Sequence, residues 1–123
     1  MKRIRLEDAK VDQLVERFAE IGIAQDQALV YDEHKKFNRL YSEMNDVDLE
    51  LRRRGVKARL ALLGLYDHPN MQVRVKAAIR TLAVAPEPAR RALQEIKESR
   101  CYPQAADASM ILRDFDNGSY KPD

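Results

Sequence analysis

Asp32, Glu33 and His34 are adjacent in the sequence and offer the donor atoms of a metal site, because carboxylates and imidazoles both bind zinc. Side chains of one helix converge on an ion only when they lie three or four positions apart. Adjacent helical residues point about 100° apart, so these three cannot converge by themselves. The pattern therefore predicts a solvated helix flank and no metal site.

His68 stands beside Asp67, as in an acid–base pair that activates a nucleophile. Three hydroxyl or thiol side chains could serve as that nucleophile: Ser99, Cys101 and Ser109. The alternative is structural, because Asp67 or Asn70 could cap the free N–H groups of the following helix, a contribution of ~1 kcal/mol. We therefore predict no enzyme activity, no catalytic residue and no cofactor.

Five cations form what we call the basic cluster, and no acidic residue occurs between positions 51 and 66. They are Arg52, Arg53, Arg54, Lys57 and Arg59. Such a cluster could bind phosphates or an acidic protein surface. It could also be the solvated end of a helix, where cations complement the macrodipole. No aromatic residue lies among the five, which disfavours binding to single-stranded nucleic acid.

Composition restricts the class of protein. The chain has 123 residues, 45% hydrophobic and 34% charged, which is typical of one globular domain over 1–123. A net charge of +2 gives no overall attraction to nucleic acid or to an anionic membrane. Cys101 is the only cysteine, which excludes an internal disulfide, and we expect it to be half-buried in a loop. The start resembles neither a signal peptide nor an anchor, and no apolar run approaches the ~20 residues of a membrane span, so we expect a cytoplasmic protein.

Apolar spacing predicts two helices in the N-terminal half. After a short extended lead over 1–6, the first runs over about 10–22 and ends at Gly22. The second is one long helix over about 25–54, bent near 32–36 and followed by Gly55 in a left-handed conformation. Its apolar residues form a heptad-like seam: Phe37, Leu40, Met44, Val47 and Leu51. This seam suggests a homodimer through the long helix as the alternative to a monomer.

Two helical hairpins are predicted in the second half, over about 56–84 and 87–117. In the first, Leu60, Leu63 and Tyr66 face inward with Leu62 and Leu65 beside them. Pro69 then occupies the first turn of the next helix. The core stripe of that helix is Met71, Val75, Ala78 and Leu82. The inward residues of the second hairpin are Ala89, Leu93 and Ile96, followed by Ala106, Met110, Ile111 and Phe115.

The two hairpins overlay when the sequence is shifted by 33 residues, which places Leu60 on Leu93 and Leu82 on Phe115. Helix–turn–helix units of this period are typical of α-solenoids, in which one hairpin covers the apolar face of the next. The residues His68-Pro69-Asn70, then Val73-Arg74, then Ala77-Ala78, resemble the inner-helix pattern D-P-D/N-P-x-V-R-x-x-A-A of the HEAT repeat family. The chain also resembles a small uncharacterised bacterial family with a HEAT-like fold.

The resemblance implies an all-α fold: a short right-handed α–α superhelix, HEAT- or armadillo-like, of about six helices including one long helix. It also implies a polar ladder in which Arg74 pairs with Asp67 or Asp107. Three positions depart from the pattern, with His68 in place of Asp, Met71 in place of Pro and Thr81 in place of Leu. The motif residues have structural roles: Asp67, His68, Pro69, Asn70, Val73, Arg74, Ala77 and Ala78.

In a solenoid, the inner helices line the surface where partners dock. Four polar residues of these helices form what we call the inner row: Gln72, Lys76, Arg80 and Arg113. The inner row could be a binding surface or a row of solvated charges that binds nothing. The predicted function is protein binding through the inner row, with Arg52, Arg53 and Lys57 of the basic cluster as further contacts. The alternatives are a HEAT-like protein that grips a nucleic-acid backbone through the basic cluster, and the antidote of a bacterial toxin system.

Overall fold

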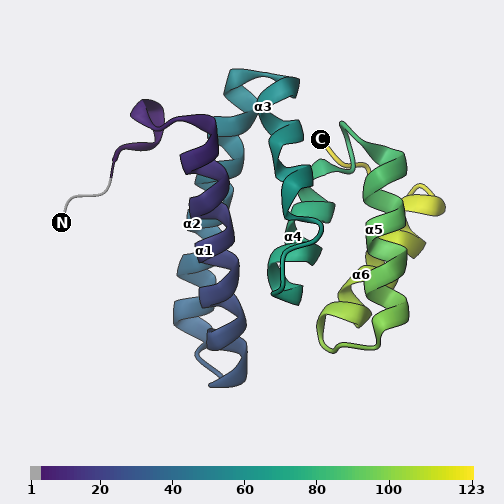
Figure 1. Ribbon diagram of the computed structural model, residues 1–123. Coiled ribbons are helices and arrows are strands. Elements are labelled where there is room, and N and C mark those ends of the chain that lie inside the picture. Colours follow the sequence, from purple (N-terminus) through teal and green to yellow (C-terminus); the bar gives the residue numbers. More distant parts are fainter. Residues whose placement is uncertain (1–3) are drawn as a thin grey trace. The chain divides into compact units, whose positions relative to one another are not determined.

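The structure, a computed structural model, describes residues 4–123. Within that range it contains six α-helices, two short 3-10 helices and no strand, which confirms the predicted all-α fold of about six helices. The bounds are η1 Leu6–Asp8, α1 Val11–Val30, α2 His34–Arg54, α3 Val56–Leu60, η2 Ala61–Leu65, α4 Met71–Thr81, α5 Pro86–Ser99 and α6 Gln104–Asp116 (Figure 1). The chain divides into two compact units, one up to Ala61 and one from Leu62. Of the predicted extended lead over 1–6, residues 1–3 lie outside the described range, and Leu6 begins a 3-10 helix.

The first unit is a helical hairpin in which α1 and α2 run side by side (Figure 1). The prediction that the first helix ends at Gly22 is wrong, because α1 continues to Val30 with Gly22 buried inside it. The prediction of one helix over 25–54 is also wrong, since the chain leaves the helix after Val30 and Asp32 adopts a left-handed φ of 57°. The predicted end of the second helix is confirmed, with α2 ending at Arg54 and Gly55 at φ 110°.

The heptad-like seam of α2 is covered within the single chain. Leu40, Met44, Val47 and Leu51 are all buried, and Phe37 is half-buried. The Gln25 side-chain amide of α1 donates to the sulfur of Met44 at 3.9 Å, so α1 supplies part of that cover. The seam is therefore an internal contact, and the predicted homodimer through it loses its basis.

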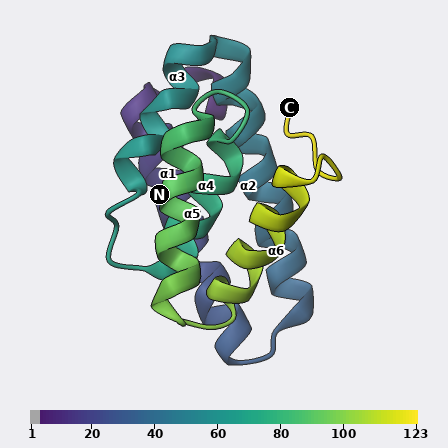
Figure 2. The ribbon, with the colours of Figure 1, turned by 90° about the vertical axis from the view of Figure 1, so that its right-hand side faces the viewer.

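The second unit contains α4, α5 and α6, which pack around one apolar core (Figure 2). The core consists of Val75, Ala78, Leu82, Ala89, Leu93, Ile96, Ala108 and Leu112. The predicted inward residues of α4 and α5 are therefore confirmed, apart from Met71, which is only partly buried against this core. Pro86 begins α5, where its missing N–H costs no helical hydrogen bond.

Several predicted orientations in the second half are wrong. Leu60 is exposed, while Leu62 and Leu65 are buried. The reason is that a five-residue helix followed by a 3-10 helix replaces the expected continuous α-helix, which changes the direction in which the later side chains point. Pro69 precedes the capping residue Asn70 and so lies outside α4. On α6, Ala106 and Met110 are exposed, and the buried residues are Gln104, Ala105, Ala108 and Leu112.

The period of 33 residues is visible in the starts of two helices, since α4 begins at Met71 and α6 at Gln104. The helices that precede them differ, because α5 has 14 residues whereas α3 has five. The second helices of the two segments, α4 and α6, therefore start 33 residues apart, whereas the first helices, α3 and α5, differ in length. The superhelical arrangement of the hairpins stays a prediction.

Candidate functional site

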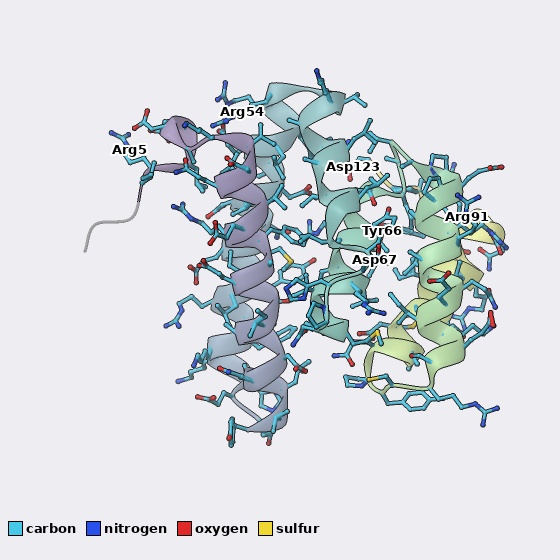
Figure 3. The ribbon with its side chains drawn as sticks, in the orientation of Figure 1. Arg5, Arg54, Tyr66, Asp67, Arg91 and Asp123 are labelled. Carbon is cyan, nitrogen blue, oxygen red and sulfur yellow. The ribbon has the colours of Figure 1, made fainter. Side chains whose placement is uncertain are left out.

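The motif before α4 is a helix cap. The Asn70 Oδ1 atom accepts the backbone N–H groups of Gln72 at 2.9 Å and Val73 at 3.2 Å, which assigns the predicted capping role to Asn70. The Nδ1 atom of His68 accepts the N–H of Asn70 at 3.0 Å, so the imidazole helps to shape the turn. Figure 3 labels Asp67 in the same turn, and its side chain is exposed. His68 is therefore bound into the backbone of the turn.

Arg74 has a different partner from the carboxylates that were predicted. Its Nε–H donates to the main-chain carbonyl of His68, six residues earlier. This hydrogen bond ties the first turns of α4 to the loop before it, so the expected ladder with Asp67 or Asp107 is wrong. The apolar motif residues Val73, Ala77 and Ala78 are completely buried.

The inner row does not form one solvated row. Gln72 is only 1% exposed, and its Oε1 atom accepts the side-chain amide of Gln104 at 2.8 Å. Burial lowers the pKa of Lys76; the nearby charge of Arg80 also lowers it, and that of Asp107 opposes the shift. Arg80 is half-buried, whereas the Arg113 side chain is 68% exposed. The expectation that Gln72 faces solvent is therefore wrong, and Arg113 is the most accessible member of the row.

The basic cluster is partly neutralised by a residue just before it. The carboxylate of Glu50 accepts Arg53 Nε at 3.0 Å and Arg54 Nε at 2.7 Å. These hydrogen bonds lower the pKa of Glu50 to about 2. Arg54, which Figure 3 labels, also donates to the main-chain carbonyl of Leu6 at 2.9 Å.

The other cations of the basic cluster differ in exposure. Arg59 is buried, Arg52 is half-buried and Lys57 is exposed. With Arg53 and Arg54 bound to Glu50, the cluster presents fewer accessible cations than the sequence indicates.

Asp32 and Glu33 lie in the exposed turn between α1 and α2, and His34, also exposed, is the first residue of α2. His34 Nε2 contacts Asp32 Oδ1 at 2.8 Å. Among the described residues, no group of three or more His, Cys, Asp and Glu side chains is arranged to hold a metal ion. Cys101 is exposed, so the expectation of a half-buried cysteine is wrong.

An open groove of about 570 Å³ lies along α6 and the end of α5, and we call it the α5–α6 groove. Three small side chains of α6 line it: Ala105, Ala106 and Ser109. Tyr102, in the loop before α6, and Met110, on α6, also line it, and they are 68% and 50% exposed. Large apolar side chains of this kind on a concave surface are typical of contact sites for other molecules.

Charged groups complete the lining of the α5–α6 groove. The cations are Lys97, Arg100 and Arg113, and the one carboxylate is Glu98. Arg100 is the residue directly after α5 and adopts a left-handed conformation, with φ 56°. Arg113 contacts the neighbouring Asp114 at 3.2 Å. Only Arg113 of this set was predicted from the sequence. Tyr102 and Met110 were missed because Met110 has the spacing of a core residue and Tyr102 lies outside every helical pattern.

The described part of the chain is thus an all-α protein whose last two helices border a groove with apolar and cationic side chains. The chain belongs to the family described as a domain of unknown function, DUF2019, which matches residues 12–116. No helix within residues 4–123 combines the length and the apolar character that crossing a membrane requires.

A solved structure is similar over almost the whole chain. It is the crystal structure of the protein RPA1889 from Rhodopseudomonas palustris CGA009, which is 43% identical to this chain with a TM-score of 0.93. The similarity covers 98% of this chain and 100% of that one. No curated protein matches the chain.

Proposed function

We propose that this chain is a non-enzymatic, HEAT-like helical module that binds another protein, and that the α5–α6 groove is its main contact surface. The observation that carries the proposal is the exposure of Tyr102 and Met110 beside small residues of α6. Tyrosine and methionine are enriched where proteins bind one another. Tyrosine buries a large area with little loss of conformational freedom, and the flexible thioether of methionine adapts to the shape of a partner. Arg113 belongs both to the lining of this groove and to the inner row.

Two features favour the groove over the other predicted contacts. Gln72 is buried and Lys76 is half-buried, so they offer less area to a partner than the sequence indicates. Arg59 of the basic cluster is buried and Arg54 is largely covered where it contacts Glu50, which weakens the alternative of a grip on a nucleic-acid backbone. An antidote role in a toxin system is one form of protein binding and is compatible with the groove. A cytoplasmic location stays a prediction.

Selection from a random peptide library tests the proposal. A displayed library of 12-residue peptides is panned against the immobilised chain. The dissociation constants of the enriched peptides are then measured for the wild type and for a Tyr102→Ala, Met110→Ala variant. Truncating two contact residues of this kind costs about 2 kcal/mol or more, so binding weakens at least tenfold.

A matched control distinguishes the groove from exposed apolar residues in general. Tyr41 and Leu49 of α2 are 44% and 55% exposed, so a Tyr41→Ala, Leu49→Ala variant removes similar side chains from another surface. The proposal predicts full peptide affinity for this control. Enriched peptides that bind the groove variant as tightly as the wild type would show that the contact surface lies elsewhere.

A further inference from the structure

We propose that the α5–α6 groove takes a short acidic segment of a partner protein, with one or two large apolar side chains among its carboxylates. This inference rests on the proposed function and adds the chemistry of the ligand. It follows from three properties of the groove: its excess of cations, its exposed apolar pair and the small side chains between them.

The cations of the groove are available to a ligand. Within residues 4–123, the side chains of Lys97 and Arg100 form no ion pair, and both residues are exposed. Arg113 contacts Asp114 through Nε while its side chain stays 68% exposed. Three cations against the single carboxylate of Glu98 give the groove lining a net charge of +2, which equals the net charge of the whole chain. A ligand with several carboxylates therefore complements this charge.

The apolar pair selects a peptide over a bare polyanion. Tyr102 and Met110 lie in one groove with the cations, so a ligand that covers the groove must remove apolar surface from water. Ala105, Ala106 and Ser109 project little from α6, which lets a partner main chain come close to the helix. A phosphate backbone would satisfy the cations but would leave the apolar pair uncovered.

Fluorescence anisotropy with defined peptides tests the ligand class. The probe is a fluorescein-labelled ten-residue peptide with a Phe-Leu pair between two runs of four Asp or Glu residues. One comparison peptide carries Asn and Gln in place of the acids, and a second carries Ala-Ala in place of Phe-Leu. A labelled 20-nucleotide oligothymidylate is the polyanion without an apolar pair.

The acidic Phe-Leu peptide is expected to bind at least tenfold more tightly than each comparison peptide and than the oligonucleotide. An Arg100→Glu, Arg113→Glu variant is expected to weaken it about tenfold and to reduce its salt dependence. The control is Arg91→Glu, Lys121→Glu, which changes the net charge equally at exposed positions outside the groove lining. Figure 3 labels Arg91 on α5. This control is expected to keep the affinity within about twofold.

The outcomes separate the ligand class from the proposed function. The acidic and the amide peptides could bind equally tightly, and both could lose affinity in the Tyr102→Ala, Met110→Ala variant. That result would overturn the preference for acids but would leave the groove as the contact surface. Tighter binding of the oligonucleotide than of the acidic peptide would also overturn the preference. Binding of the acidic peptide that neither the Arg100→Glu, Arg113→Glu variant nor the apolar variant weakens would overturn both proposals.

Discussion

The buried amide pair between α4 and α6 gives the sharpest prediction about stability. Gln72 and Gln104 are 1% and 2% exposed, and the side-chain amide of Gln104 donates to Gln72 at 2.8 Å. A Gln104→Ala substitution leaves a buried carbonyl without that donor, at a cost of about 1–3 kcal/mol. It also removes one buried methylene, worth ~0.8 kcal/mol, and the side-chain entropy that is regained is of at least that size and offsets this loss. We therefore expect a loss of about 2 kcal/mol for Gln104→Ala.

A double-mutant cycle isolates the hydrogen bond. Gln72→Ala is expected to cost about as much as Gln104→Ala, and the two changes together to cost about 1 kcal/mol less than their sum. Urea unfolding at pH 7, followed by far-UV circular dichroism, measures the three free energies. In thermal unfolding, each kcal/mol corresponds to about 4 °C for a chain of this size.

Gln94→Ala is the matched control for the cycle. The Gln94 amide donates to Glu98 at 3.3 Å on an exposed part of α5, so its loss is expected to stay within about 0.5 kcal/mol. Additive effects below ~0.5 kcal/mol at both Gln72 and Gln104 would contradict the burial of the pair. Such a result would indicate that Gln72 faces solvent, as the sequence predicts.

Three further predictions concern the cap of α4, the carboxylate of Glu50 and the end of α5. Asn70→Ala is expected to lower the free energy of unfolding by about 1 kcal/mol because two N–H groups lose their acceptor, whereas Asn70→Ser keeps most of it; a loss as large in the Ser variant would contradict the capping role. The lowered pKa of Glu50 stabilises the folded chain above pH 4.5, and this contribution is lost as the pH falls toward about 2. The wild type should therefore lose more stability than Glu50→Gln in urea titrations between pH 4.5 and 2.5, and parallel pH profiles would count against the ion pairs. Arg100→Gly is expected to raise the free energy of unfolding by about 0.5–1 kcal/mol because glycine adopts a left-handed φ without strain, whereas Arg100→Ala should not; equal stability of the two variants would refute this explanation.

Helix positions in the second half were predictable because their signals are local. Asn70 caps α4, Pro86 begins α5, and the apolar residues of α4 and α5 repeat at helical spacing. Gly22 gave a false signal, because a glycine in a helix costs only ~1 kcal/mol and burial can compensate for it. The sequence indicated a bend near 32–36 but not a complete break, because aspartate in a left-handed conformation leaves no strong mark in a sequence.

The candidate site was less predictable, because exposure depends on contacts between distant residues. Gln72 was predicted to face solvent from its position on α4, but its partner Gln104 is 32 residues away. Glu50 lies directly before positions 51–66, the stretch without acidic residues, and it binds Arg53 and Arg54 of the basic cluster. Met110 has the spacing of a core residue, yet Leu112 is the buried residue of that turn. Each of these outcomes depends on the rotation of α6 or α2 about its own axis. The spacing of apolar residues in the sequence determines this rotation only to within about one residue.

The most direct test of the central claim is a chemical-shift map of the ¹⁵N-labelled chain titrated with the acidic Phe-Leu peptide. A contact surface in the α5–α6 groove predicts saturable amide shifts concentrated between Lys97 and Arg113. Shifts concentrated at Lys76 and Arg80, or at Arg52 to Lys57, would assign binding to the inner row or to the basic cluster and would contradict the claim.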